Sequence, residues 1–529
     1  MQRFYLALKF KKNQYFREAV YMDRRRFVIN LVSNLFSALS GIGISFFLTP
    51  YIVEHLGKEA YGFFPLTNNF IMYAGIISTA LNSMSSRYIT ISLEKKEIKE
   101  VNTYFNSILF GNFLISFFFI LVSALFCFFI SNILDIPNHL FADVRLLFIF
   151  MFISLIINVS SAVFSVTAFA LNRFDKLAYI NIASNVIKLA AIVLLFYLFT
   201  PKIYFLGLVT AVISLYTLIA NYRLTKKLLP EIAIDWAFFS KSTLSLVVGA
   251  GIWNSIMALS NVINTQLDLL IANHFFGASG MGFLSLTKFI PNAIYILLGI
   301  IVPIFLPEMF KAYAQNDFNK LKHTLDQSFK AIFLVVLVPL AVFFVYGEDF
   351  FHLWLPTQDA HGLHLLSIIT LVPFIVHGTV ETVYHVFVIT NKLRMASIWG
   401  IFISVLNYIL VMLLCLYSNL GVYAIPVAAL ISGVFSHLTF TPLYAAYCLQ
   451  EKRWYFFVKM IKGLSGFMLL LAIAYGWKKL DLFIIDSWIS FLTNSLIIGI
   501  ILFVVSLFMK FERSELYESY KKLKSRAIG

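Results

Sequence analysis

The sequence predicts an all-α integral membrane protein with about 14 transmembrane helices, built as two pseudo-symmetric six-helix lobes followed by two C-terminal helices. Three observations support this prediction: an apolar composition, an internal repeat, and an uneven distribution of lysine and arginine along the chain. The same distribution places the N- and C-termini in the cytoplasm.

The composition requires lipid as the main solvent. Of the 529 residues, 60% are hydrophobic and only 13% are charged, and the mean hydropathy is +0.85. A soluble protein of this size needs more charged groups at its surface. Runs long enough to cross a bilayer lie near residues 27–53, 61–92, 103–133, 146–171, 177–199, 203–222, 243–272, 283–310, 327–347, 363–390, 395–418, 420–448, 456–477 and 487–509.

One short segment occurs twice. Residues 57–67 (GKEAYGFFPLT) match residues 277–287 (GASGMGFLSLT) at five positions, where composition alone predicts about one match. The identical pairs are Gly57/Gly277, Gly62/Gly282, Phe63/Phe283, Leu66/Leu286 and Thr67/Thr287. Each copy lies between two apolar runs, so the repeat indicates two homologous halves. A duplicated membrane bundle is typical of a transporter whose substrate path lies between the halves.

Lysine and arginine cluster in alternate connections. With the N-terminus inside, the cytoplasmic segments hold the basic groups at 24–26, 95–99, 223–227, 320–322, 452–453 and 521–526, and the outer loops keep only Lys58, Arg145, Lys202, Lys478 and Lys479. This alternation follows the positive-inside rule. The net charge of +15 is therefore a topology signal and a contact with anionic lipid headgroups, and no nucleic-acid partner is expected.

These signals predict the following organisation of the chain. It comprises a basic, amphipathic cytoplasmic segment (1–26), an N-lobe (27–225), a cytoplasmic linker (226–242), a C-lobe (243–450), the thirteenth and fourteenth transmembrane helices (451–509) and a basic cytoplasmic tail (510–529). Cys127, Cys415 and Cys448 lie in or at the ends of apolar runs without CxxC spacing, so no disulfide framework or zinc site is predicted.

Polar residues recur at helical spacing inside several runs. In the run 243–272, Asn254, Asn261, Asn264 and Asp268 are separated by seven, three and four residues and therefore share one face. Comparable stripes in other runs are Asn30, Asn34, Ser37, Gly41 and Ser45; Ser154, Asn158, Ser161 and Ser165; and Asn181, Asn185 and Lys188. Either each stripe packs helix against helix, or the stripes together line a shared polar cavity, as the added charges favour.

Charged residues in the apolar runs mark candidate positions in that cavity. Asp268 precedes the predicted outer loop 273–282 and Lys288 follows it, so the two can form an ion pair that faces a central cleft or only locks two helices. Lys188 lies near mid-membrane, where a cavity position is expected. Arg87 lies near the cytoplasmic end of its run, where it either snorkels to headgroups or lines a water-filled mouth with its polar neighbours.

A titratable triplet occurs in the run 363–390. His377, Glu381 and His385 are spaced four residues apart and share one helix face. A carboxylate flanked by imidazoles changes charge near neutral pH, so the triplet is a candidate proton relay or coupling-cation site. Interhelical hydrogen bonding is the alternative. A bound metal is not expected, because the spacing supplies no fourth ligand.

The plan of six, six and two helices, the repeated Gly57-x4-Gly62-Phe63 pattern and the segment 82–87 (NSMSSR) resemble polysaccharide-export proteins of the Wzx flippase type. That family belongs to the multidrug/oligosaccharidyl-lipid/polysaccharide (MOP) exporter superfamily, which includes the MATE drug exporters and the lipid II flippases. The resemblance covers nearly the whole chain and implies a MATE-like fold.

The resemblance also implies a non-enzymatic flippase of the bacterial inner membrane, working by alternating access. Its substrate would be a polyprenyl-pyrophosphate-linked oligosaccharide, the repeat unit of a lipopolysaccharide O-antigen, capsule or exopolysaccharide, moved from the inner to the outer leaflet. Candidate substrate-binding residues are Arg87, Lys188, Lys288, Asn254, Asn261 and Asn264, and candidate ion-coupling residues are Asp268, Glu381, His377 and His385. No cofactor is expected, and coupling to Na⁺ or H⁺ is open.

The expected partners are the lipid-linked oligosaccharide and membrane lipids, with polysaccharide polymerase and assembly proteins as further candidates. The internal duplication makes a monomer sufficient. Two other functions remain open. A MATE-like, cation-coupled drug exporter is disfavoured because the first apolar run has no acidic residue in its core. An integral membrane glycan polymerase or ligase is disfavoured because no long outer loop offers catalytic groups.

Overall fold

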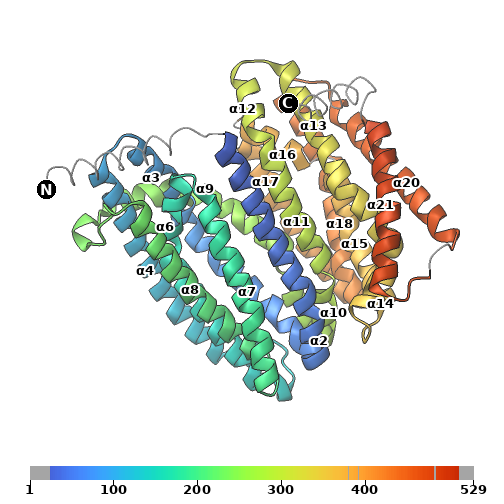
Figure 1. Cartoon of the computed structure of the whole chain (residues 1–529), viewed down its shortest axis with the longest axis horizontal. Helices are drawn as coiled ribbons and strands as arrows, with labels where there is room; N and C mark the ends of the chain where they lie inside the picture. Colours follow the sequence, from blue (N-terminus) through green and yellow to red (C-terminus); the bar gives the residue numbers. More distant parts are fainter. Residues whose placement is uncertain (1–23, 379–380, 391, 482–483, 511–529) are drawn as a thin grey trace. The chain divides into compact units, whose positions relative to one another are not determined.

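The computed structural model describes residues 24–378, 381–390, 392–481 and 484–510 (Figure 1). Every regular element in these ranges is a helix, which confirms the prediction of an all-α protein. By their internal contacts the described residues divide into two compact units, one ending at Gly282 and the other beginning at Phe283. The predicted N-terminal segment and basic tail lie almost entirely outside the described residues.

The first unit is built from long helices joined by short turns. Its helices are α2 (Arg24–Asn82), α3 (Ser85–Glu94), α4 (Ile98–Phe128), α5 (Ile130–Ile133), η1 (Asn138–Leu140), α6 (Phe141–Ala170), α7 (Phe174–Leu198), α8 (Tyr204–Leu228), η2 (Trp236–Phe238), α9 (Lys241–Thr265) and most of α10 (Asp268–Leu286). In Figure 1, α6 packs against both α4 and α8. A buried apolar core joins α3, α4, α6, α9 and the chain before α9 through Ile89, Phe105, Val163, Val247 and Ile232.

Both glycines that open the repeated segment hold the same unusual backbone conformation. Gly57 inside α2 has φ 77° and ψ 164°, and Gly277 inside α10 has φ 67° and ψ −171°. Positive φ favours glycine because other residues meet a steric penalty there. The Thr49 and Tyr61 hydroxyl oxygens lie 3.2 Å apart, although 12 residues of straight helix span about 18 Å. The chain therefore folds back at Gly57, and α2 consists of two helices in contact.

The two copies of the repeat pack on each other at these bends. A Cβ atom on Gly62 would lie 2.8 Å from the Gly282 Cα atom, and one on Gly282 would overlap the Lys58 carbonyl oxygen. Only glycine at both positions permits this approach of backbone to backbone. The sequence repeat thus corresponds to two matching helix corners in direct contact.

The linker before α9 is held against α4 by amide side chains. Asn102 receives a hydrogen bond from the Ala233 N–H (2.8 Å) and donates to the Glu231 carbonyl (3.2 Å). Asn106 does the same with the Asp235 N–H (3.0 Å) and the Ala233 carbonyl (2.8 Å). Two amides that each donate and accept replace the hydrogen bonds that this irregular segment cannot make internally.

The second unit is also entirely helical within the described ranges. Its helices are α11 (Phe289–Ile301), η3 (Val302–Ile304), α12 (Leu306–Ala314), α13 (Phe318–Ile332), the π-helical turn η4 (Phe333–Leu337), α14 (Val338–Trp354), α15 (Ala360–Gly378), α16 (Glu381–Ile389), α17 (Leu393–Tyr417), η5 (Gly421–Tyr423), α18 (Ala424–Leu438), α19 (Phe440–Cys448), α20 (Tyr455–Lys479) and α21 (Trp488–Lys510). One core joins α11, η4, α15, α20 and α21 through Leu298, Phe333, Leu371, Phe467 and Leu502.

Eleven helical segments of the described residues are long and apolar enough to cross a membrane, and Phe289–Ile304 and Ala360–Val376 are shorter apolar segments. The count of about 14 spans and the cytoplasmic termini stay predictions. So do the predicted lobe boundaries. Helix α9 belongs to the first compact unit because it packs along α2, where the Ser255 hydroxyl donates to the Ile76 carbonyl (2.8 Å).

The prediction of an outer loop at residues 273–282 was wrong. Apart from the bend at Gly277, these residues are helical and belong to α10. A single glycine with positive φ turns the chain sharply while the residues on either side keep their helical hydrogen bonds. A bend of this kind leaves no polar loop in the sequence.

Candidate functional site

The most informative polar site of the first unit is a break between α9 and α10. Helix α9 ends at Thr265, and α10 begins at Asp268, inside one apolar segment that runs from Lys241 to Leu286. The Asn69 amide (2.7 Å) and the Tyr73 hydroxyl (2.6 Å) both donate to the Gln266 carbonyl oxygen at the break. A carbonyl freed from a helix inside a membrane needs such partners, because lipid supplies none.

Asp268 stands at the first position of α10, where it is half-buried. One of its carboxylate oxygens accepts the Leu269 N–H at 2.8 Å, so the acid caps the start of its own helix. The predicted single face of Asn254, Asn261, Asn264 and Asp268 is therefore interrupted, because Asp268 lies beyond the end of α9.

Sequence reasoning missed Asn69 and Tyr73. Both lie in the apolar run 61–92, four residues apart and therefore on one helix face. Asn69 was a usable signal, since an amide inside an apolar run requires a partner. The residues at the break are Gln266 and Leu267, and neither is a helix-breaking glycine or proline. The sequence therefore contains no local signal that the helix ends there.

Lys188 is a charged residue in the interior of a helix of the first unit. It lies on α7, about 15 Å before the end of that helix at Leu198. Its ammonium nitrogen is 5.1 Å from the centre of the Phe64 ring on α2, an arrangement in which the ring face attracts the cation. Within the described residues no carboxylate forms an ion pair with it. Its positive charge is thus held by an aromatic face instead of being neutralised.

The surroundings of Lys188 are polar on the same side of α7. One turn earlier, the amide nitrogen of half-buried Asn185 is 3.4 Å from the position that a Cβ atom would take on Gly41. The missing side chain at Gly41 leaves room for this amide beside α2. The predicted stripes of the first and fifth apolar runs therefore meet along α2 and α7.

Two other residues that the sequence predicts to bind substrate, Asn254 and Arg87, lie near the end of α2 at Asn82, which is expected to face the cytoplasm. Asn254 on α9 donates to the Ser83 hydroxyl at 3.0 Å. The amides of Asn82 and Asn112 exchange hydrogen bonds of 2.9 and 3.0 Å beside this contact. Arg87 is exposed on α3 and follows directly from this cluster in sequence. The amides join α2, α4 and α9, and the guanidinium stays free of them.

The remaining predicted residues are distributed over both units. Asn261 is exposed on α9, and the side chain of Asn264 lies outside the described residues. In the second unit Lys288 is the half-buried residue before α11, and His385 is half-buried on α16. The side chains of His377 and Glu381 also lie outside the described residues, so the shared face of the triplet stays a prediction.

For the stripe on α6, the packing alternative holds. The Ser154 and Ser214 hydroxyls lie 2.6 Å apart, and the Asn158 amide donates to Ser214 at 3.1 Å. Ser161 and Ser165 donate to carbonyl groups of their own helix. These residues join α6 to α8, as small polar residues commonly do between membrane helices.

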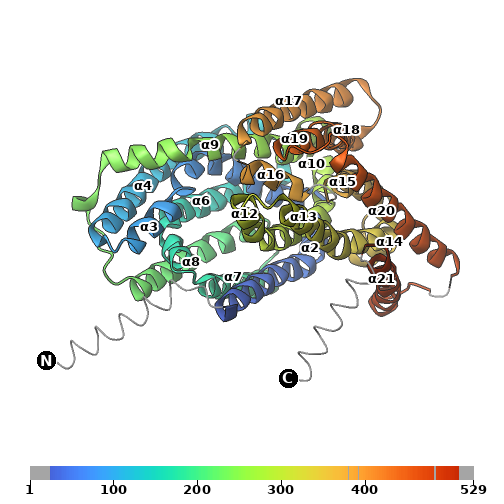
Figure 2. The same cartoon turned by 90° about the horizontal axis from the view of Figure 1, so that it is seen from above.

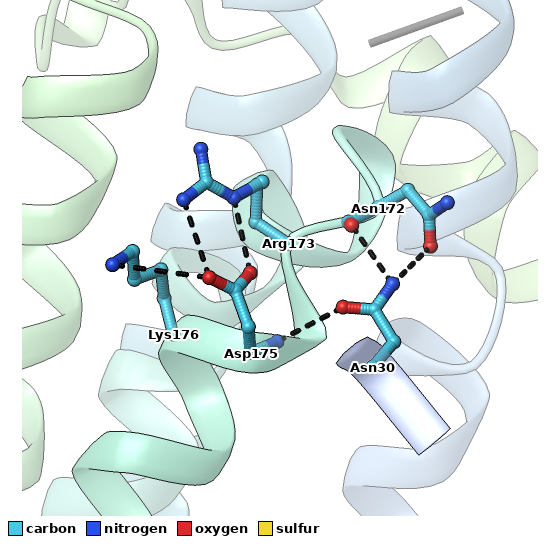
Figure 3. A network of polar contacts seen from close by, with 5 residues as sticks. All are labelled: Asn30, Asn172, Arg173, Asp175 and Lys176. Carbon is cyan, nitrogen blue, oxygen red and sulfur yellow. Dashed lines mark hydrogen bonds and ion pairs between the residues drawn. The ribbon is translucent and has the colours of Figure 1, made fainter. Parts of the chain in front are cut away.

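Asn30, the first residue of the predicted stripe in α2, has a structural role. Figure 3 shows its amide nitrogen donating to the Asn172 backbone carbonyl (3.1 Å) and side-chain oxygen (3.0 Å), while its oxygen accepts the Asp175 N–H (3.2 Å). Arg173 makes a two-point ion pair with the Asp175 carboxylate (3.0 and 3.2 Å), and the Lys176 ammonium lies 3.8 Å away from it. The network fixes the α6–α7 turn to the start of α2.

Comparison with known proteins identifies the architecture. No family model matches the chain. The chain is 27% identical over 512 residues to "Uncharacterized membrane protein EpsK" of Bacillus subtilis (strain 168). This alignment covers 94% of this chain and 99% of EpsK. The structure of lipid II flippase MurJ in an inward closed conformation matches with TM-score 0.65 and 15% identity, over 90% of this chain and 98% of MurJ. The inward-facing structure of a MATE family multidrug resistance transporter of the MOP superfamily matches with TM-score 0.59 and 14% identity, over 80% of this chain and 98% of the transporter chain.

The chain has the fold of these MATE and MurJ structures. This confirms the MATE-like architecture that the sequence predicts. Within this fold, stability measurements can test the two hydrogen bonds at the break between α9 and α10.

Removing both donors to the Gln266 carbonyl is expected to destabilise the protein. We predict that Asn69→Leu with Tyr73→Phe lowers the free energy of unfolding by about 1–3 kcal/mol, because a partly buried carbonyl at membrane depth then lacks a partner. Each single variant should cost less than half of this, since the other donor remains. Thermal unfolding of the purified protein in detergent measures the effect. Tyr197→Phe, which removes a hydroxyl from a side chain that is 84% exposed, should change nothing; equal losses in this control would contradict the explanation.

Proposed function

We propose that this protein is a flippase that moves a polyprenyl-pyrophosphate-linked oligosaccharide from the inner to the outer leaflet of a bacterial inner membrane by alternating access. The substrate class is the repeat unit of an O-antigen, capsule or exopolysaccharide, in the manner of the Wzx-type proteins. The observation that carries the proposal is Lys188, a cation at mid-depth of α7 that is held by the Phe64 ring and not by a carboxylate.

The chemistry of this position suits an anionic lipid-linked substrate. A lysine ammonium binds pyrophosphate through charge-assisted hydrogen bonds. Amides such as that of Asn185 can donate to and accept from sugar hydroxyls. The fold is shared with the lipid II flippase MurJ, which supports movement of a lipid-linked substrate between leaflets as the class of reaction. Arg87, Lys288, Asn254, Asn261 and Asn264 remain proposed substrate-binding residues.

Ion coupling is assigned to the break between α9 and α10 in this proposal. Interrupted membrane helices commonly place backbone carbonyls and a charged group where a coupling ion binds. Asp268, two residues after Gln266 and at the first position of α10, supplies the charged group at this break. His377, Glu381 and His385 are the second proposed group, and Na⁺ and H⁺ are both consistent with these ligands.

Drug export is the second candidate function, because MATE transporters share the fold. An exporter of cationic drugs requires an acidic group in its binding cavity. The described part of α2 before Glu54 contains no aspartate or glutamate, and α7 carries Lys188 at depth instead. This charge pattern favours an anionic substrate. A glycan polymerase or ligase remains the alternative among enzymes.

A leaflet assay tests the proposal. In a strain that lacks the gene, the lipid-linked oligosaccharide is expected to accumulate in a form that an impermeant sugar-oxidising probe reaches only after spheroplasts are lysed. Expression of the wild-type gene should restore labelling in intact spheroplasts. If labelling is normal without the gene and only polymer length changes, the enzymatic alternative replaces the flippase; if only drug sensitivity changes, the drug-exporter alternative does.

A further inference from the structure

The second unit contains a basic hollow that the proposed transport path does not use. It has a volume of about 570 Å³ and is lined by Lys392, Leu443, Tyr447, Gln450, Glu451 and Arg453. Lys392 precedes α17, Leu443 and Tyr447 belong to α19, and the other three residues form the turn between α19 and α20. Figure 2 shows α17, α18 and α19 packed beside one another.

The charges of the hollow favour an anion. The Lys392 ammonium lies 4.8 Å from the centre of the Tyr447 ring, which holds it at the wall of the hollow. Glu451 is the acidic member of the lining, and its carboxylate is neutralised by the Lys322 ammonium at 2.7 Å. Lys392 and Arg453 therefore set the charge of the lining at about two positive charges.

The backbone of the turn is fixed in a way that keeps the lining in place. Gln450 has φ 56°, and the Glu451 N–H donates to the Ala446 carbonyl at 2.9 Å. This is a helix-ending motif that satisfies the last carbonyl groups of α19. The Tyr444 hydroxyl donates to the Lys392 carbonyl at 3.1 Å and so ties the start of α17 to α19. The hollow is thus a built feature of three connected elements.

Apolar and aromatic side chains surround the basic lining. Leu443 is 42% exposed and Tyr447 67% exposed, and Trp454 beside the turn is 72% exposed. Exposed tryptophan and tyrosine are typical of the membrane–water boundary. The sequence predicts that the start of α17 and the turn at 449–454 lie on the cytoplasmic side, where the leaflet contains anionic lipids. A ligand in this hollow would therefore contact basic side chains and apolar side chains at the same time.

We propose that this hollow binds the phosphate group of an anionic inner-leaflet lipid, with Lys392 and Arg453 as the phosphate ligands and Leu443 beside the acyl chains. The arginine fork and the lysine point charge are both common phosphate ligands. The site does not depend on the proposed flippase function, because it lies wholly within the second unit and shares no residue with the proposed substrate or coupling sites.

Lipid titration of the full-length protein in detergent tests this site. The unfolding temperature of the wild-type protein, followed by tryptophan fluorescence, is expected to rise with dioleoylphosphatidylglycerol and not with dioleoylphosphatidylcholine, because a ligand that binds the folded state stabilises it. Lys392→Gln with Arg453→Gln should weaken the apparent affinity about 30-fold, and Arg453→Gln alone about fivefold. Since Arg453 is exposed, the single variant is expected to fold normally even if the double variant does not.

The control variant is Arg394→Gln with Lys452→Gln, which removes two exposed cations next to the lining. It should keep the wild-type response. An equal loss of affinity in this control, or an equal response to phosphatidylcholine, would overturn the proposal. Titration with inorganic phosphate and glycerol 3-phosphate separates a lipid from a soluble anion. Stabilisation by these soluble anions that is as tight as by the lipid and is lost with Lys392 and Arg453 would overturn the assignment to lipid.

Discussion

Replacing Lys188 with glutamine is expected to reduce transfer of the lipid-linked oligosaccharide by about tenfold or more, because it removes a charge-assisted hydrogen bond to the pyrophosphate. Glutamine keeps most of the side-chain length and a hydrogen-bond donor, so the fold should tolerate the change. Removing an unneutralised cation from membrane depth should also leave the unfolding temperature unchanged or raise it. The leaflet assay in spheroplasts, with protein levels matched by immunoblot, measures the transfer.

Three further variants separate charge from structure at this position. Lys188→Arg keeps the charge and should retain most of the transfer. Phe64→Leu keeps an apolar side chain but removes the ring face that holds the ammonium at 5.1 Å, so an intermediate loss is expected. Lys176→Gln removes the same charge from the same helix at an exposed position near Asp175 and should have no effect. If Lys188→Gln with Lys288→Gln transports normally, the cationic path does not exist.

The sequence was sufficient to predict the fold class and the correspondence of the two repeats. Gly57 and Gly277 occupy matching positions of the repeat, and the structure has positive φ at both. Lipid imposes strong constraints on composition, since each span needs a long apolar run. Patterns of this kind depend on the chain alone and can be recognised without knowing any contact.

The candidate site was less predictable because its features depend on partners distant in sequence. The break after Thr265 exists because Asn69 and Tyr73, about 200 residues earlier, satisfy the Gln266 carbonyl. The stripes on α2 and α6 looked alike in sequence, yet Asn30 fixes a turn and Asn158 joins α6 to α8. Helical spacing shows which residues share a face, but it does not show what that face contacts.

The second large expected effect concerns the contact between the two repeat corners. In Gly282→Leu the new side chain would overlap the Lys58 carbonyl oxygen, which is backbone and cannot rotate away. Overpacking of this kind costs about 1–3 kcal/mol, so the corners should part in at least a fraction of the molecules. We expect transfer of the oligosaccharide to fall, since alternating access requires each end of the path to close in turn.

Cysteine labelling can detect the parted corners. Ala60 is only 2% exposed beside the contact, so Ala60→Cys, in a chain lacking Cys127, Cys415 and Cys448, should react slowly with an impermeant maleimide. Adding Gly282→Leu should raise the labelling rate about tenfold. Gly75→Leu is the matched control, because a Cβ atom at Gly75 meets no atom within 4 Å. Unchanged labelling in Gly282→Leu would mean that the corners stay together, and the close approach of Gly62 and Gly282 would then have no part in opening the path.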